Sequence, residues 1–378
     1  MPDMIKIIDL NNSFEWDYLV CSFQNHDIYY LNGYVKGFAL HGDGEPKLLY
    51  YEANNLRAIY VYNLRPLGSG WFDIITPYGY GGILFDGDIS ESNKQSFEAA
   101  FETFMKDNNI ICNFVRYHPL LQNANDMRSL TQVIDLGKTI AIDLSSEDII
   151  WNNITSKNRN MIRKAEKNGV TIEHSHDIAI FDDFIRIYNE TMDNDNADDY
   201  YYFNDSFYES IHKDLNKKYE MFYACYQGKI IAMSIILYCN GMMHYHLSGS
   251  LFEFRNLAPT NLLLYKAACW GCKQGFRIFH LGGGFGSGED NLFKFKAAFN
   301  RNSGIQFSIG KQIFNQYMYE KLVNIRINED SSFDTDSRFF PLYRHKISIK
   351  QLQTIRAELM LYTQSKKILS MSKIENRN

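Results

Sequence analysis

The chain has 378 residues, of which 45% are apolar and 15% aromatic, enough material for about two packed domains. Its formal net charge of −5 gives no overall basic footprint, so DNA is not an expected partner, although one face could carry a local basic groove. No apolar run approaches the roughly 18 residues that span a bilayer.

The N-terminus and the cysteines bear on the location of the protein. Residues 1–17 lack the basic start, apolar stretch and small-residue cleavage site of a signal peptide. The six cysteines are scattered, mostly in apolar strand or helix contexts, which indicates buried thiols in a reducing compartment rather than a disulfide framework. We therefore expect a cytoplasmic protein.

The first part of the chain has the pattern of a mixed α/β domain. Short β-like runs occur at Gly37–His41, Lys47–Tyr51, Ala58–Leu64 and Trp71–Thr76. A glycine-rich loop with the sequence TPYGYGG follows at residues 76–82. The pattern then predicts a helix over Glu91–Asp107 and strands over Ile110–Arg116 and Thr139–Leu144.

The domain boundary is expected just before a helix that follows residue 145. Ser145 is a capping residue with Asp148 three positions later, and Gly169 stands where a left-handed C-terminal cap belongs. These signals predict one helix that ends at Asn168. Because no Pro- or Ser-rich linker separates the halves, we expect them to pack against each other.

The second part of the chain has a readable order of elements. Helices are expected over Ile178–Thr191 and Asp205–Lys217, and three β-runs follow at Tyr219–Tyr226, Lys229–Asn240 and Met243–Ser250. Gln-Gly and Asn-Gly pairs join these runs as tight turns. The pattern then predicts a helix over Pro259–Lys273, a strand over Arg277–Leu281 and a short helix around residues 293–296. This order indicates an α/β domain in which an antiparallel meander is followed by a helix beside a parallel strand pair.

Several of these segments resemble a known family. The run SKNRNMIRKAEKNG (156–169) resembles the entry helix of FemABX-type transferases, and residues 261–299 resemble the closing segment of the same family. The PYGYGG run (77–82) and the FFPLYR run (339–344) are similar to motifs of GNAT-like acyltransferases associated with bacterial polysaccharide assembly. Together the motifs span most of residues 15–345.

The resemblance implies a fold and a domain division. We expect an α/β (α+β mixed sheet) protein with two tandem GNAT-like domains, at residues 1–145 and 146–345, and a C-terminal helical tail at 346–378. The acceptor is then expected between the domains, and the donor is expected to reach the second one.

The resemblance also implies transfer of an acyl or aminoacyl group to an amine of a cell-envelope precursor, such as a nucleotide- or lipid-linked sugar or peptide. The donor would be acyl-CoA or aminoacyl-tRNA, so tRNA is an expected partner. No cofactor is expected to stay bound, and the protein would be at most peripheral to a membrane. The alternative is a catalytically inactive GNAT-fold binding module in polysaccharide assembly.

A cation is the central expected site residue. Acyl transfer needs positive charge where the tetrahedral oxyanion develops. In the family a Phe-Lys pair serves that purpose, and by position it corresponds to Phe295 and Lys296. Lys294 is the competing cation, and the plainer alternative is that Lys296 is a solvated residue of an amphipathic helix.

Three further groups are candidates for substrate binding. Arg159, Arg163 and Lys167 share one helix face, which suits a phosphate-rich ligand but is equally compatible with an ordinary exposed face. Tyr78 and Tyr80 belong to a glycine-rich loop that could stack on or hydrogen-bond a ligand, or form a packed turn. Tyr245 and Arg255 form the third group of expected substrate-binding residues.

The segment from Arg255 to Thr260 departs from the coenzyme-A pattern. Both glycines of that loop are missing and Pro259 removes an amide donor, which puts ordinary acetyl-CoA binding in doubt. No metal site is expected either. Cys269 and Cys272 lie within a helix, residues 193–198 lack the Gly and Glu of a calcium loop, and no acidic or cysteine set is apparent beside His244 and His246.

Overall fold

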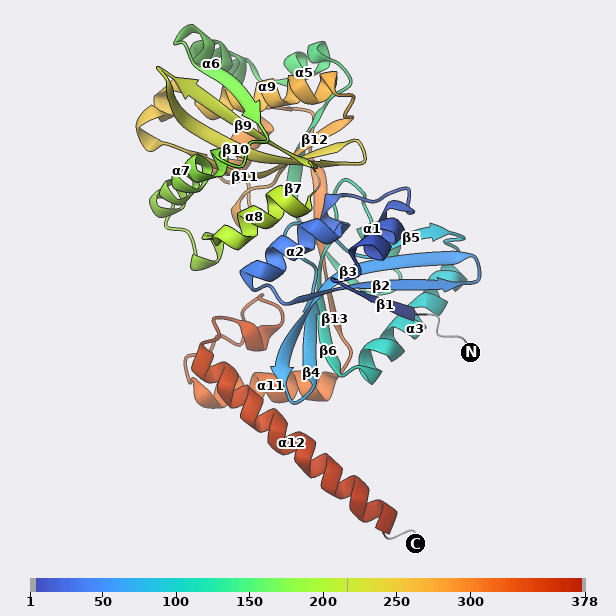
Figure 1. Cartoon of the computed structure of the whole chain (residues 1–378). Coiled ribbons are helices and arrows are strands. Elements are labelled where there is room, and N and C mark those ends of the chain that lie inside the picture. Colours follow the sequence, from blue (N-terminus) through green and yellow to red (C-terminus); the bar gives the residue numbers. More distant parts are fainter. Residues whose placement is uncertain (1–4, 216, 376–378) are drawn as a thin grey trace.

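The structure is a computed structural model that describes residues 5–215 and 217–375, with side chains up to residue 364. Thirteen strands of the described chain form one mixed sheet, in the order β1-β2-β3-β4-β6-β13-β7-β12-β11-β10-β9-β8, with β5 paired to β3. Figure 1 shows this sheet passing from a lower half, built from the first residues, to an upper half, built from the middle of the chain.

The lower half contains six strands and the helices that cover them. The strands are β1 (Ile5–Asp9), β2 (Glu45–Ala53), β3 (Leu56–Gly68), β4 (Trp71–Ile75), β5 (Leu84–Gly87) and β6 (Ile110–Arg116). The helices are α1 (Ser13–Cys21), η1 (Ile28–Tyr30), α2 (Asn32–His41), α3 (Glu91–Asp107) and α4 (Ala124–Met127).

One predicted strand of the lower half is wrong. Residues 37–41 are the last turns of α2, which ends at Gly42 in a left-handed conformation (φ 110°). Val35 and Phe38 of this helix are buried, three residues apart on one face. The short apolar run could not be told from a strand by its pattern alone.

The upper half follows a long connecting strand, β7 (Gln132–Asp143). Its strands are β8 (Thr171–Ser175), β9 (Tyr219–Tyr226), β10 (Lys229–Cys239), β11 (Met242–Ser250) and β12 (Ile278–Gly282). Its helices are α5 (Glu147–Asn153), α6 (Ser156–Lys167), α7 (Ile180–Asn194), η2 (Asp199–Tyr201), α8 (Asp205–Asp214), η3 (Phe252–Leu257), α9 (Pro259–Lys273), η4 (Phe285–Ser287) and α10 (Asn291–Ala297).

The single helix predicted after Ser145 is two helices. The cap of α5 is Ser146, one residue later than expected, whose hydroxyl accepts a hydrogen bond from the Ile149 N–H at 3.1 Å. Thr155 then caps α6, and its own N–H donates to the Ala298 carbonyl at 3.0 Å. This contact with a distant segment breaks the helix, whereas Gly169 has the expected left-handed conformation (φ 82°).

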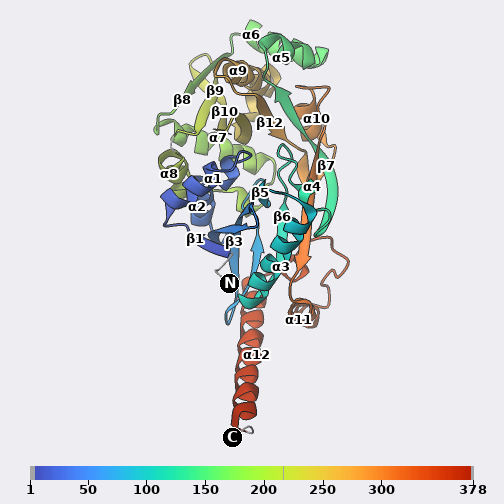
Figure 2. The same ribbon diagram turned by 90° about the vertical axis from the view of Figure 1, so that its right-hand side faces the viewer.

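The chain returns to the lower half after residue 300. Strand β13 (Ile305–Ile313) pairs antiparallel with both β6 and β7. The two long strands β7 and β13 run side by side in Figure 2. The last elements are α11 (Gln316–Glu329), η5 (Leu342–Arg344) and α12 (Ile349–Glu375), which points away from the body of the molecule. The proposed boundaries at residues 145 and 345 stay predictions.

The two halves pack closely, as expected. One cluster of buried apolar side chains includes Trp16 and Phe38 of the lower half together with Phe207 and Phe279 of the upper half. Helix α2 contacts α8 at Gly33, where a Cβ atom would lie 2.2 Å from the Asp214 carbonyl oxygen. Only glycine permits this approach.

All six cysteines are free, and three of them (Cys112, Cys239 and Cys269) are buried. Cys21 is exposed, so the prediction of buried thiols is wrong for this residue. Among the described residues, no helix is both long enough and apolar enough to cross a bilayer.

Each half contains one pair of parallel neighbouring strands. The β4–β6 pairing ends at Ile75 and Phe114, where the loop of residues 76–82 leaves the sheet; we call this the first strand opening. The β11–β12 pairing ends at His244 and His280, while β11 continues to Ser250; we call this the second strand opening. These openings position the candidate site.

Candidate active site

A cavity of about 270 Å³ lies between the two strand openings. The first opening supplies Tyr78, Tyr80 and Arg116, and the second supplies Tyr245, His246 and His280. The remaining wall consists of Tyr29, Lys138, Thr139, Leu281, the glycines 79 and 282–284, Ser287, Lys296 and Phe307. Segments far apart in the sequence therefore meet at one cavity.

Lys296 is the buried cation of this cavity. It belongs to α10, whose first turn is capped by Asp290 through a 2.8 Å hydrogen bond from the Phe293 N–H. The side chain is only 8% exposed, and Nζ donates to the Gly283 carbonyl at 2.7 Å. Burial lowers the pKa of Lys296 to about 8, against a small opposing effect of the Asp290 charge.

The glycine turn after β12 lets Lys296 and Tyr80 approach each other. Gly282 has a φ of 78°, and a Cβ atom there would lie 3.4 Å from Lys296 Nζ and 3.6 Å from the Tyr80 hydroxyl. Burial raises the pKa of Tyr80, so its hydroxyl stays a neutral donor. An ammonium group and a phenol thus converge on one point of the wall.

Two imidazoles line the same cavity. His280 is 2% exposed, and burial followed by the positive potential of His244 lowers its pKa well below the ordinary value. The same two causes lower the pKa of His246 to about 3. The Nε2 atom of each ring is buried without a hydrogen-bond partner among the described residues. Both rings are therefore neutral near pH 7, and burial makes them weak bases.

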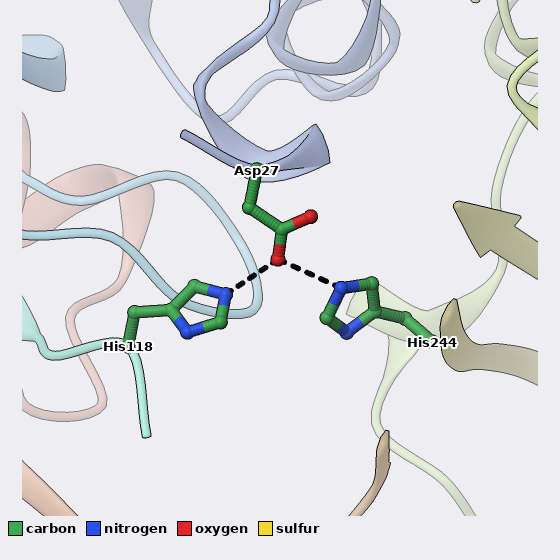
Figure 3. Close-up of side chains that lie close together, drawn as sticks. All are labelled: Asp27, His118 and His244. Carbon is green, nitrogen blue, oxygen red and sulfur yellow. Dashed lines mark hydrogen bonds and ion pairs between the residues drawn. The ribbon is translucent and has the colours of Figure 1, made fainter. Parts of the chain in front are cut away.

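Behind the cavity, three buried side chains meet across the two halves (Figure 3). The Nε2 atoms of His118 and His244 lie 2.6 and 2.7 Å from the same oxygen, Oδ2 of Asp27. The other carboxylate oxygen accepts from the Ile28 N–H at 2.7 Å. The expectation that His244 has no acidic residue beside it is wrong, because Asp27 comes from a segment more than 200 residues earlier.

Asp27 is ionised in this cluster. Burial favours the neutral acid, but the His244 charge and the hydrogen bond from His118 outweigh it and hold the pKa of Asp27 below its usual range. Burial lowers the pKa of His118, against the opposing effect of Asp27. Asp27 therefore brings a carboxylate charge to the junction of the halves.

The cluster is the part of the described chain whose side chains could ligate a metal, since its three ligand atoms lie within 4.8 Å of one another. The 2.6 Å contact of His118 is a hydrogen bond, whereas His244 Nε2 lies 2.7 Å from the same oxygen without hydrogen-bond geometry. The Leu121 N–H donates to Nδ1 of His118 at 3.3 Å, which leaves the ring proton on Nε2, facing Asp27. Asp27 therefore joins the two halves through a hydrogen bond from His118 and a close contact with His244.

Other predicted site residues lie away from the cavity. Phe295 packs against Phe299, with ring centroids 5.4 Å apart. The α6 residues lie beyond the upper sheet (Figure 1), where Arg163 covers the Trp151 ring at 5.0 Å and Arg159 covers it at 5.9 Å. Lys167 is an exposed residue at the end of the same helix.

Arg255 also lies outside the cavity wall. Its guanidinium lies 4.7 Å from the Phe252 ring centroid and 3.8 Å from the Asp195 carboxylate. The following helix begins after Ala258, which has a left-handed conformation (φ 56°), and Pro259 occupies its first turn.

Sequence reasoning did not single out several cavity residues. Arg116 is the last residue of a buried strand, and side chains at such positions often reach a ligand site. This position is the sequence feature that could have indicated Arg116. His280 and Lys138 carried no comparable signal, because their neighbours in the cavity come from segments far away in the sequence.

Comparison with known proteins defines the class. Residues 154–294 match the family model described as an acetyltransferase (GNAT) domain. A search of curated protein sequences finds no match. The crystal structure of FemX is similar over 84% of this chain and 99% of its own, with a TM-score of 0.62 and 15% identity.

Two further solved structures are similar to the chain. One is the C-terminal domain of a putative lysylphosphatidylglycerol synthetase from Agrobacterium fabrum, with a TM-score of 0.52, 13% identity and coverage of 80% of this chain and 92% of its own. The other is a conserved protein of unknown function from Bacteroides thetaiotaomicron, with a TM-score of 0.55, 11% identity and coverage of 82% and 99%.

These findings show a fold of the GNAT type. More particularly, its mixed α/β structure is similar to that of FemX over nearly the whole FemX chain, and its middle segment matches a GNAT domain by sequence. The predictions of the fold class and of the family resemblance are confirmed.

Proposed function

We propose that the cavity between the strand openings is the active site of an acyltransferase or aminoacyltransferase whose acceptor is an amine. The observation that carries this proposal is Lys296, a buried ammonium group at the cavity wall beside the Tyr80 hydroxyl. Burial of a cation costs free energy unless an opposite charge compensates it, and an oxyanion that develops during the reaction would provide that charge.

The reaction follows from these groups. The acceptor nitrogen attacks the carbonyl carbon of the donor ester or thioester, and the carbonyl oxygen becomes an oxyanion that Lys296 and Tyr80 stabilise. The bond to the leaving oxygen or sulfur then breaks as the carbonyl re-forms. The proton of the attacking amine passes to water or to the substrate itself, because burial makes His280 a weak base.

The donor is acyl-CoA or aminoacyl-tRNA, which binds for the reaction and then leaves. The start of α9 favours the second, because Ala258 and Pro259 replace the amide-rich turn that would cradle a pyrophosphate. Arg159, Arg163 and Lys167 of α6 would contact the phosphates of a large donor such as tRNA, with Arg255 nearer the start of α9.

The acceptor would be a nucleotide- or lipid-linked sugar or peptide of cell-envelope or polysaccharide assembly. Tyr78 and Tyr245 of the cavity wall are proposed to contact it, since phenols stack on rings and bond to hydroxyl groups. The protein would act in the cytoplasm, where it could be peripheral to a membrane.

A second candidate function is a catalytically inactive binding module. The observation that favours it is the same altered start of α9, because a domain without a donor-binding turn can keep its fold while losing its chemistry. Such a module would bind the acceptor and transfer nothing.

Purified protein incubated with labelled acyl-CoA, or with charged tRNA, and with amine acceptors tests the proposal. Transfer that RNase abolishes identifies the tRNA donor, and transfer that RNase leaves intact identifies acyl-CoA. The Lys296→Ala variant should lose on the order of 10²–10³ in rate. Lys294→Ala, a change of an exposed residue of the same helix, should stay near wild type.

The pH profile gives an independent reading. If the ammonium form of Lys296 is needed, transfer should fall as the pH rises through about 8, where that form is lost. Equal rates for Lys296→Ala and wild type would contradict the role of Lys296. Absence of transfer from every donor, with acceptor binding intact, would favour the inactive module.

A further inference from the structure

The charges on the cavity wall are all of one sign. Arg116, Lys138 and Lys296 contribute to the wall, and none of the described residues that line it is Asp or Glu. A cavity of low dielectric with cations on its wall creates a positive potential that attracts anions and repels cations. The wall is therefore matched to a ligand that carries negative charge.

Arg116 is held in place without being neutralised. Its Nη2 donates to the carbonyls of Thr76 and Pro77, at 3.2 and 3.0 Å. Its Nε atom is buried without a hydrogen-bond partner among the described residues, and no carboxylate lies within 4.0 Å. By contrast, Arg65 and Arg344 both pair with the buried Asp73.

The acidic residue whose charge interacts with Arg116 is Asp43, which is held by another group. The Tyr200 hydroxyl donates to its Oδ2 atom at 3.0 Å. Burial raises the pKa of Asp43, while that hydrogen bond and the charges of His41 and Arg116 oppose the rise. Asp43 is not part of the cavity wall, so Arg116 keeps donors free for a ligand.

We infer that this cavity recognises its substrate through an anionic group, a carboxylate or a phosphate, which Arg116 binds. The carbonyls of Thr76 and Pro77 use both Nη2 hydrogens, so either group accepts from Nη1 of the guanidinium, and the flanking Tyr78 and Tyr80 rings exclude water from the pair. As a statement about substrate choice, this inference rests on the proposed function. It means that the amine acceptor, or the donor beside it, is anionic or zwitterionic rather than a simple polycation.

Isothermal titration calorimetry at low salt tests the site without any turnover. The probes are inorganic pyrophosphate and succinate, which separate phosphate from carboxylate recognition, and ethylenediamine serves as the cationic probe. Wild type should bind at least one anion and should not bind the diamine. Arg116→Gln should weaken anion binding by tenfold or more, and Arg116→Lys should keep part of it because the charge remains.

Two further variants guard against a folding artefact. Arg186→Gln makes the same charge change on the exposed face of α7, so it should bind the anions as wild type does. Lys138 is an exposed residue of the wall whose side chain makes no hydrogen bond or ion pair within the described chain, so Lys138→Gln should weaken binding severalfold without disturbing the fold.

The outcomes separate this inference from the proposed function. Anion binding that is equal in wild type, Arg116→Gln and Lys138→Gln, or absent from wild type, overturns the inference even if acyl transfer is observed. Anion binding that depends on Arg116 supports it even if no donor supports transfer, in which case the proposed function alone fails.

Discussion

Both strand openings lie where the pairing of two parallel strands ends, and they contribute different chemistry. In the first, the loop after β4 and the end of β6 supply phenols and the guanidinium of Arg116. In the second, β11, β12 and α10 supply neutral imidazoles and Lys296, whose pKa is about 8. A repeated pair of parallel strands thus provides the opening, and the residues after each strand decide what it does.

The largest expected effect comes from breaking the junction behind both openings. Asp27→Ala removes the carboxylate that His118 and His244 both contact, and it leaves the buried Nε2 donor of His118 facing no acceptor. We expect the free energy of unfolding to fall by about 3–5 kcal/mol, measured by urea denaturation at pH 7. Asp183→Ala, which breaks an exposed pair, should cost less than about 1 kcal/mol. Equal losses would show that the junction does not join the halves.

The second expected effect is a higher free energy of unfolding when the buried charge of Lys296, at the second opening, is removed. In the folded protein the pKa of Lys296 lies near 8, below its unfolded value, so the unfolded state binds more protons between about pH 8 and 10.5 and stability rises with pH there. Lys296→Met should abolish that rise and stabilise the protein at pH 7 by about 1–3 kcal/mol. Lys294→Met should leave the pH dependence of the melting temperature unchanged.

The third expected effect separates backbone strain from cavity contacts. Gly282→Ala and Gly275→Ala each place a side chain at φ near 80°, which should cost about 1–2 kcal/mol in both. The new methyl group meets open space at residue 275, but at residue 282 it lies between Lys296 Nζ and the Tyr80 hydroxyl. Gly282→Ala alone should therefore reduce transfer and anion binding. A similar loss in both variants would mean that the fold, and not the cavity, was damaged.

The smallest expected effect lies outside both openings. Arg255 is exposed and 3.8 Å from an exposed Asp195, so Arg255→Gln should change the free energy of unfolding by less than about 0.5 kcal/mol. If the start of α9 still contacts a donor, the same variant should raise the KM for that donor. An unchanged KM would remove Arg255 from the binding surface.

Local signals predicted the regular elements of the fold well. The bounds of α3, α9, β6 and β9 follow from capping residues, apolar periodicity and tight turns, all of which act within a few residues. The break at Thr155 and the strand β13 were not predicted, because each depends on partners from distant segments.

The candidate site shows the same limit. Lys296, Tyr78, Tyr80 and Tyr245 were singled out from motifs, and the structure places all four on one cavity wall. The junction of Asp27, His118 and His244 needs contacts between residues more than 85 positions apart, and Arg116 is held by carbonyls about 40 positions away, which no local pattern encodes. The charge balance of a cavity is a property of the folded wall as a whole.

The position of β13 constrains how the protein is made. A ribosome synthesises the β6 and β7 strands about 160–190 residues before β13, which fills the gap between them. Until then the nascent chain has two open strand edges, of the kind that invite pairing with other chains. The last strand to emerge is therefore the one that closes the sheet, and proteins truncated before residue 305 should aggregate rather than accumulate as a folded upper half.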